Sequence, residues 1–434
     1  MNTNSGDSAR SSAKPRYQRG VRDQIKIEMR SLDQQLPANH VARLAWAFVQ
    51  KLDLSEYYAR IKAVEGGPGR SAVDPAILIA LWLLATIDGI GSARELEERC
   101  RDDLPYQWLC GDVGVNYHLL SDFRTDDPER LDKLLVTLLA ALLSQDLISL
   151  ARVAQDGMRV RASAGGSSFR RGERLEKHLQ EAQAQVDALK NQVDDDQGSA
   201  DRRAKAARER AAQERVERIE EALAQLSELE AKMEQRKKGD GEKARCSTTD
   251  PDARRMKMAD GGTRPAYNVQ LATTDETRII VGWDLTNVGS DSGLMAPMVD
   301  QIETHFGVRP GEYLTDGGFS TLDDIQELES RGSTVYTPVK EVDKKRVRGQ
   351  DPFAPRKGDS PWIAAWRIRM GTEAAKAIYK LRPSLAEFPN AVFRNRGLRQ
   401  FVVRGLASVK AVTMWHVLAF NFTRLRSLGL LDRL

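Results

Sequence analysis

Cysteine, histidine and long apolar runs are all scarce in this sequence. The 434 residues include three cysteines and five histidines, and these form no spaced cluster of the kind that binds zinc. So few cysteines exclude a disulfide framework and fit a reducing cytosol. The longest apolar run, Ala76 to Ala85, is about half of what a bilayer span needs. Met1 to Arg16 is polar and lacks an apolar signal core, so we expect a cytoplasmic protein with a disordered leader over residues 1–30.

The net charge is small, but its distribution is uneven. Lys and Arg number 66 against 62 Asp and Glu, which leaves a net charge of +4. Residues 391–434 carry one acid, Asp432, and eight basic residues: Arg394, Arg396, Arg399, Arg404, Lys410, Arg424, Arg426 and Arg433. Such a stripe can neutralise DNA phosphates and release counterions. A solvated, amphipathic C-terminal helix explains the same charges, so charge alone leaves both interpretations open.

The first third of the chain has the periodicity of helices. Apolar residues between Val41 and Leu52 recur at spacings of three and four. Helix starts are predicted at Asp74-Pro75, at the capping box Ser92-Ala-Arg-Glu95 and at Asp127-Pro128. We therefore predict an all-α N-terminal domain over residues 31–148. A DNA-binding module and a plain structural bundle both fit this pattern.

A charged helical tract interrupts a second, mixed region. Residues 172–241 are rich in Ala, Gln, Glu and basic residues, with a narrow apolar seam at Val216, Ile219, Leu223 and Leu226. A helical hairpin that breaks around Asp194–Gly198 is the simplest interpretation. A single solvated helix or a coiled coil that binds a partner are the alternatives.

Strand signals flank this tract on both sides. Buried or alternating runs are found at Leu150–Asp156, Tyr267–Leu271, Ile279–Leu285, Glu312–Asp316 and Ser333–Val339. Helices are predicted between them at Met295–Phe306 and Leu322–Glu329, and again from Trp362 onwards. This order predicts an α/β catalytic domain made of residues 149–171 and 242–434, with 172–241 as a helical insertion.

Two acids stand out because each follows a predicted strand and precedes a glycine. In an open α/β sheet, ligands gather where strands end, and glycine lets the backbone turn there. If Asp156 and Asp316 meet at this edge, their charges repel unless a divalent cation offsets them. Two such cations can activate a water or a 3′ hydroxyl and stabilise the leaving oxygen of a phosphodiester. Taken singly, each Asp is better explained as a strand-end or turn residue than as a catalytic acid.

Read together, several segments resemble the DDE transposases of bacterial insertion sequences. Asp156-Gly-Met-Arg-Val-Arg-Ala-Ser-Ala164 resembles their first catalytic strand, and Thr315-Asp-Gly-Gly-Phe-Ser320 resembles their second catalytic turn. Tyr379-x2-Arg382-x4-Glu387-x6-Arg394 resembles the Tyr-Arg-Glu-Lys signature of one branch, in which a helical insertion is also typical. Further likeness lies in Ser247–Arg254, Pro265–Gln270, Gly69–Pro75 and Ser121–Arg124.

The resemblance implies an RNase H-like mixed five-stranded sheet that carries a metal-dependent site. Asp156, Asp316 and Glu387 would bind Mg²⁺, with Mn²⁺ able to substitute. The residues expected to face DNA phosphates are Tyr379, Arg382 and Arg394, followed by Arg396 and Arg399 in the basic stretch.

The C-terminal signature departs from the family pattern in two ways. Four residues separate Arg382 from Glu387, where the family more often has three, and Arg394 stands where Lys is usual. Prolines 383 and 389 bracket Glu387, so we expect it near a helix start. Glu373 is the alternative third acid.

The resulting hypothesis is a transposase that cleaves the ends of an insertion sequence in double-stranded DNA and transfers them to target DNA. The family implies a homodimer or larger assembly on DNA, associated with the bacterial nucleoid. Two other hypotheses stay open: a non-catalytic DNA-binding protein, such as a decayed transposase acting as a repressor, and a coiled-coil scaffold.

Overall fold

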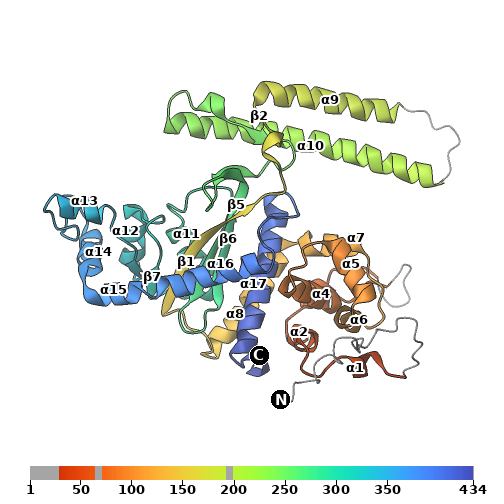
Figure 1. Ribbon diagram of the computed structural model, residues 1–434, viewed down its shortest axis with the longest axis horizontal. Helices are drawn as coiled ribbons and strands as arrows, with labels where there is room; N and C mark the ends of the chain where they lie inside the picture. Colours follow the sequence, from red (N-terminus) through yellow and green to blue (C-terminus); the bar gives the residue numbers. More distant parts are fainter. Residues whose placement is uncertain (1–28, 64–70, 192–198, 434) are drawn as a thin grey trace, which may run out of the picture.

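The computed structural model describes residues 29–63, 71–191 and 199–433, with the side chains of 199–203 excepted (Figure 1). All but the last two residues of the predicted leader therefore lie outside the described chain. So does the break predicted at 194–198. Within the described ranges, no helix combines the length and the apolar character needed to cross a bilayer.

Eight helices are found in the described part of the N-terminal region. They are α1 (Leu32–Gln35), α2 (Val41–Val49), α3 (Ser55–Tyr58), α4 (Pro75–Ile87), α5 (Ala93–Asp102), α6 (Leu104–Cys110), α7 (Tyr117–Thr125) and α8 (Pro128–Ser144). The predicted starts are found, since the side chains of Asp74, Ser92 and Asp127 each accept a hydrogen bond from a backbone N–H in the first turn. The central helix α4 is buried from Pro75 to Thr86, so the other helices pack around it.

A mixed sheet follows, consistent with the RNase H-like fold that the resemblance implied. Its strands are β1 (Arg152–Arg161), β4 (Arg254–Lys257), β5 (Thr263–Thr274), β6 (Ile280–Thr286), β7 (Glu312–Leu314) and β8 (Thr334–Tyr336). The path runs β6-β5-β1-β7-β8, with the short β4 beside the start of β5. The pairs β6-β5 and β5-β1 are antiparallel, whereas β1-β7 and β7-β8 are parallel.

Strand β5, next to β1, differs from the expectation in one respect. Its alternating pattern predicted polar side chains on a solvated face, yet every residue from Pro265 to Thr274 is buried. The polar Gln270 is 1% exposed and accepts a hydrogen bond from Gln155, which also donates to the carbonyl of Leu294 at the start of α11 (Met295–Phe306). Because the α11 segment covers this face, Gln270 finds its hydrogen-bond partners inside the protein and donates to Asn268 and Asp291.

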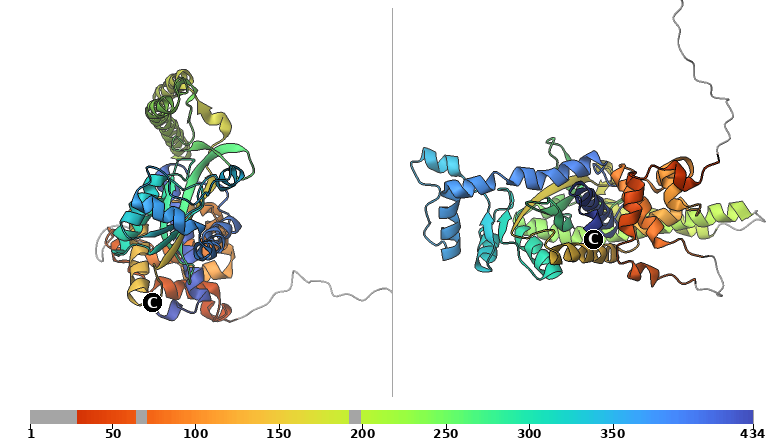
Figure 2. Two further views of the ribbon diagram at one scale, coloured as in Figure 1. Left: turned by 90° about the vertical axis from the view of Figure 1, so that its left-hand side faces the viewer. Right: turned by 90° about the horizontal axis from the view of Figure 1, so that it is seen from below.

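The charged tract forms a pair of packed helices outside the sheet (Figures 1 and 2). Helix α9 (Gly172–Lys190) lies along α10 (Ser199–Arg236). At their base, β2 (Phe169–Arg170) pairs with β3 (Cys246–Ser247). The short helix η1 (Gly166–Ser168) precedes β2, and η2 (Gly241–Lys243) precedes β3. The pair has its own small core, separate from the main one: Leu175, Ala182, Val186, Ala212, Val216, Ile219, Ala222, Leu226, Ala244 and Cys246.

The C-terminal part returns to the sheet and to the N-terminal helices. Its elements are α12 (Leu322–Ser330), α13 (Val342–Val347), α14 (Pro361–Gly371), α15 (Glu373–Tyr379), the π-helix η3 (Pro383–Glu387), α16 (Phe388–Asn395), α17 (Leu406–Ser427) and η4 (Leu431–Arg433). The interpretation of the C-terminus as a solvated amphipathic helix is wrong. Helix α17 is buried on nearly all sides because it packs between α4, α8 and β6.

Candidate active site

The strand register brings Asp156 and Asp316 to one place. Parallel strands β1 and β7 pair through Ala154 and Leu314, so each Asp lies two residues beyond a paired position. Asp156 is in the middle of β1 and not at its end as expected, because the antiparallel partner β5 holds β1 in extended form to Arg161. The neighbour β7, however, ends at Leu314. Asp156 therefore has no β7 residue paired beside it.

The two carboxyl groups differ in exposure and in partners. The Asp156 side chain is 16% exposed and accepts hydrogen bonds from Asn390 Nδ2 at 3.0 Å and from the Gly157 backbone N–H at 3.0 Å. Burial raises the pKa of Asp156 to about 6, against the opposing effect of the Arg382 charge. The Asp316 side chain is 42% exposed and accepts from the Gly318 N–H at 2.7 Å. Asp316 thus faces solvent, with Asp156 beneath it.

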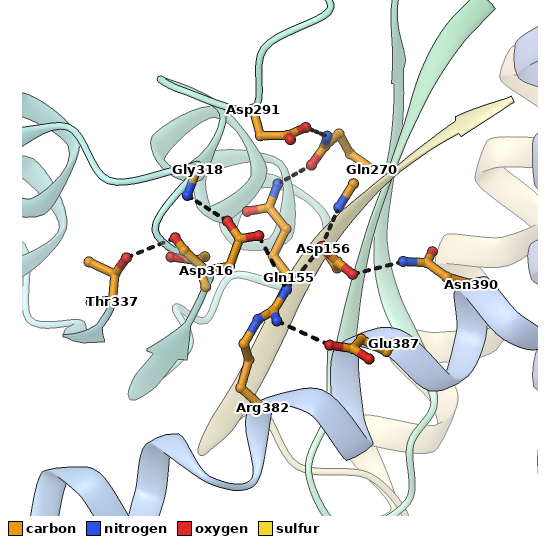
Figure 3. Close-up of polar contacts among 12 residues, drawn as sticks. Gln155, Asp156, Gln270, Asp291, Asp316, Gly318, Thr337, Arg382, Glu387 and Asn390 are labelled. Carbon is orange, nitrogen blue, oxygen red and sulfur yellow. Dashed lines mark hydrogen bonds and ion pairs between the residues drawn. The ribbon is translucent and has the colours of Figure 1, made fainter. Parts of the chain in front are cut away.

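A single guanidinium lies among all three predicted acids (Figure 3). Arg382 Nη2 is 3.0 Å from Asp156 Oδ1 and 3.7 Å from Asp316 Oδ2, and Nη1 is 3.4 Å from Glu387 Oε1. Arg382 is only 8% exposed. Buried charges of one sign persist where an opposite charge compensates them, so Arg382 acts as the counter-ion of this cluster.

The unusual spacing of the C-terminal signature has a structural explanation. Residues Pro383–Glu387 form a π-helix, in which the backbone bonds from i to i+5 and one extra residue enters the turn. Glu387 is the last residue of this turn and the N-cap of α16. The extra residue that separates Arg382 from Glu387 is absorbed there, and their side chains still meet. Glu387 is therefore near a helix start, as Pro383 and Pro389 predicted.

The alternative third acid lies elsewhere. Glu373 is at the start of α15, its side chain is 90% exposed, and it pairs with Lys376 at 2.7 Å. The Lys376 ammonium lowers the pKa of the Glu373 carboxyl. The structure thus places Glu387, and not Glu373, against Arg382.

The residues predicted to face DNA phosphates have different surroundings. Tyr379 is half-buried beside the acids, and burial raises the pKa of its phenol while Arg382 lowers it. Arg394 is exposed, and its side chain bonds to no described residue. Arg399 is also exposed and donates to the Arg394 carbonyl at 3.4 Å. Arg396 instead points into the protein and donates to Thr423 Oγ1 at 2.9 Å.

A polar network lies behind Asp156, and no sequence pattern predicted it. Asp291 accepts from Asn268 and Gln270, both at 2.8 Å, and from Arg159 at 2.7 Å. A Cβ added at Gly157 would lie 2.4 Å from Asp291 Oδ1 and 2.5 Å from Gln270 Nε2. A side chain at position 157 would clash with this network, so close packing is the reason for the glycine. The sequence analysis had attributed the glycine to a turn.

The donor set suits a hard divalent cation, but Arg382 occupies the space between the donors. Carboxylate oxygens are the ligands that Mg²⁺ and Mn²⁺ prefer. In the described ranges, no three acidic, histidine or cysteine side chains are arranged to hold a metal ion as they stand. The three carboxylates converge on a cation that belongs to the protein, so the residues fit a metal once Arg382 moves aside.

Two family models match the chain. One, described as Transposase domain (DUF772), matches residues 30–126, and the other, described as Transposase DDE domain, matches residues 240–382. The second match includes Asp316 and Arg382 but ends before Glu387, and Asp156 precedes it. No curated protein and no solved structure matches the chain. A DDE domain implies a nuclease and strand-transfer enzyme that acts on DNA and generally uses divalent metal ions. With an N-terminal transposase domain, an RNase H-like sheet and a DDE domain in one chain, this protein belongs to the DDE transposases of insertion sequences.

Proposed function

We propose that this transposase cleaves double-stranded DNA at the ends of its insertion sequence and joins the freed 3′ ends to target DNA. Asp156, Asp316 and Glu387 are its catalytic residues and bind Mg²⁺, which Mn²⁺ can replace. The observation that carries the proposal is the convergence of these three carboxylates on one buried guanidinium. They come from β1, the β7 turn and the η3–α16 junction, so only the fold brings them together.

Each residue of the cluster has a distinct task in this proposal. Asp156, held by Asn390 and the Gly157 N–H, is the fixed ligand, while the more exposed Asp316 and Glu387 adjust to it. When bound, divalent cations activate the attacking water or 3′ hydroxyl and stabilise the leaving oxygen. Arg382 neutralises the acids in the metal-free protein and, once displaced, is free to contact a phosphate as a bidentate fork.

A basic groove between the hairpin and the catalytic domain supports the proposal that the protein binds DNA. A cleft of about 1050 Å³ lies between α10, the segment from η2 to β4, and the loop at 287–289. Two acids and seven cationic residues line it, the latter being Arg171, Lys232, Arg236, Lys243, Arg245, Arg254 and Arg255. The carbonyl of Gly289 in this wall accepts a hydrogen bond from Arg159, which lies three residues along β1 from Asp156. Because side chains alternate along a strand, Arg159 and Asp156 lie on opposite faces of the sheet.

We further propose that the N-terminal helical domain, residues 31–148, binds DNA and that the hairpin, residues 172–241, forms one wall of the DNA path. The exposed Arg394 and Arg399 would add phosphate contacts near the catalytic acids. Because both ends of an element must be held together for transposition, the working form is a homodimer or larger assembly on DNA.

The direct test is a cleavage assay on DNA that carries the element's ends. Asp156→Ala and Asp316→Ala should each abolish Mg²⁺-dependent cleavage and strand transfer, because each removes a metal ligand. DNA binding, measured by fluorescence anisotropy, should persist in both variants. Full cleavage by either variant would overturn the assignment of these acids. Metal-independent binding without cleavage by the wild type would favour a repressor.

A further inference from the structure

A pocket separate from the carboxylate cluster lies where the N-terminal helices meet the C-terminal part. Its volume is about 270 Å³. Residues on α4, the start of α5, α7, the turn after α16, and α17 line it, among them Trp82, Ser92, Arg124, Arg396, Gln400 and His416. Gly89 and Gly397 bring the two parts together there, since a Cβ on Gly397 would lie 3.1 Å from the Gly89 carbonyl oxygen.

Arg124 brings an almost uncompensated charge to this pocket. It is 6% exposed, and its guanidinium lies over the Trp82 ring at 4.4 Å. Its one hydrogen bond in the described chain runs from Nη1 to the Gly91 carbonyl at 2.6 Å, and the buried Nε has no acceptor. Burial lowers the pKa of Arg124 to about 10, so the side chain stays charged at neutral pH.

Arg396 brings a second charge to the same place. Nη2 donates to Thr423 at 2.9 Å, and the buried Nη1 has no acceptor. The neighbouring His416 is 8% exposed and its Nδ1 also has no partner. Burial, reinforced by the charges of Arg396 and Arg124, lowers the pKa of His416 to about 3. His416 is therefore neutral and leaves both positive charges to the arginines.

The nearby acids are engaged with other groups. Glu95 lines the pocket but pairs with Arg99 at 3.6 Å. Asp88 attracts Arg396 from a distance, while its carboxylate accepts from the Tyr106 hydroxyl at 2.7 Å. Within the described ranges, neither Arg124 nor Arg396 has a carboxylate at ion-pair distance. Burying charges without a counter-ion is costly, so the arrangement calls for an anion from outside the chain.

We propose that this pocket binds a phosphate group between Arg124 and Arg396. Guanidinium groups recognise phosphate oxygens by paired, charge-assisted hydrogen bonds. The ten-residue helix α5 begins at the pocket with Ser92 as its N-cap, and its dipole favours a negative charge there. Ser92 and Gln400 are exposed, and Val402 is 59% exposed, so the pocket can be reached from solvent. The phosphate can be a DNA phosphodiester or a free phosphate ion.

The first experiment is thermal unfolding of the full chain in sodium phosphate and in sodium chloride of equal ionic strength. Phosphate should raise the midpoint by about 1 °C, the shift that roughly 1 kcal/mol of ligand stabilisation gives in a chain of 434 residues. Arg124→Met and Arg396→Met should lose this shift, whereas the exposed Arg174→Met, on α9 and away from the pocket, should keep it. In chloride, the two buried-site variants should be as stable as the wild type or more so, because an uncompensated buried charge is removed.

The second experiment separates the two sources of phosphate. DNA affinity is measured against salt for the wild type, Arg396→Met and Arg174→Met, the last being an exposed position of α9 that lines neither the pocket nor the groove. If the pocket takes a DNA phosphodiester, Arg396→Met lowers the salt slope by about 0.9, the contribution of one phosphate, and inorganic phosphate competes with DNA. If it takes free phosphate, the slope is unchanged and only the thermal shift is seen. The thermal arm needs no DNA and no catalysis, so it stands apart from the proposed transposition.

A third measurement covers the case in which a variant does not fold. Phenylglyoxal modification of Arg396 in the wild type, followed by peptide mass mapping, should be slowed by phosphate or by DNA and not by chloride. A thermal shift that is equal in all variants would overturn the proposal. So would the absence of any effect of phosphate and DNA on both the wild-type midpoint and the protection of Arg396.

Discussion

Arg382 and Glu387 form an ion pair of 3.4 Å although four residues lie between them. In a regular α-helix, residues that face each other are three or four positions apart. The π-helical turn Pro383–Glu387 corrects this offset by taking in one extra residue. A spacing that departs from the family pattern therefore still delivers an acid to the cluster.

Glu387→Gln should lose most metal-dependent cleavage, because the neutral amide is a weaker metal ligand than the carboxylate. A fall of at least about 100-fold in the cleavage rate is expected, the scale of metal-site losses. Glu373→Gln is the matched control, since Glu373 is 90% exposed and pairs only with Lys376. Gel-based cleavage assays at saturating Mg²⁺ compare the cleavage rates of the two variants. A larger loss of rate in Glu373→Gln than in Glu387→Gln would make Glu373 the third acid.

Arg382→Met should destabilise the metal-free protein much more than the metal-bound protein. The substitution leaves Asp156 largely buried without its counter-ion, which costs about 3–5 kcal/mol when a buried pair loses one partner. A divalent cation would restore the compensation. Urea unfolding with EDTA and with saturating Mg²⁺ measures both free energies of unfolding. The control is the exposed Arg394→Met, which should change either free energy of unfolding by less than about 0.5 kcal/mol. If Arg382→Met lost the same free energy of unfolding with EDTA and with Mg²⁺, the result would argue against a metal ion at this site.

Metal binding should weaken steeply below pH 6. Burial raises the pKa of Asp156 to about 6, so at lower pH the carboxyl is protonated and a metal ion must displace the proton. Folding without metal has the opposite dependence on pH: the raised pKa favours the folded state below the ordinary pKa of 3.8, and this contribution is lost as pH rises to about 6. Calorimetric titration with Mg²⁺ should show affinity falling about tenfold per pH unit between pH 6 and 5 and levelling above pH 7. Flat affinity from pH 5 to 7 would contradict the role of Asp156.

The DNA path can be tested by reversing charge in the groove. Arg245→Glu combined with Arg255→Glu should lower the salt slope of DNA binding by about two phosphates' worth, roughly 1.8. Both side chains are exposed, so the fold should be unaffected. The control pair, Arg174→Glu with Lys177→Glu, makes the same change of charge on exposed positions of α9 outside the groove. Anisotropy titrations over a range of salt concentrations measure the two slopes. Equal slopes for the groove variant and the control variant would mean that DNA does not bind in the groove.

The sequence predicted those elements whose signals are local. Caps at Asp74, Ser92 and Asp127 and the buried run at Ile279–Leu285 correspond to α4, α5, α8 and β6. The burial of α17 was missed, because its basic residues suggested a solvated face while its burial depends on distant partners.

At the site, motif resemblance singled out the three acids, but it could not reveal their contact with Arg382. That contact depends on the register of β1 with β7 and on a π-helical turn. The partners Asn390 and Asp291 had no signal either, since single polar residues carry no pattern.

The two Asp-Gly pairs look alike in the sequence but should respond differently to substitution. At Gly157 a Cβ would lie 2.4 Å from Asp291 Oδ1, so Gly157→Ala must displace β1 or break the polar network, at a cost of about 1–3 kcal/mol. At Gly317 a Cβ meets nothing within 4 Å, so Gly317→Ala should change the free energy of unfolding by less than about 0.5 kcal/mol. Urea unfolding measures the stabilities, and cleavage assays should show a larger loss in Gly157→Ala, because a shift of β1 moves Asp156 away from Asp316. Equal stability and activity in the two variants would mean that the network behind Asp156 does not position it.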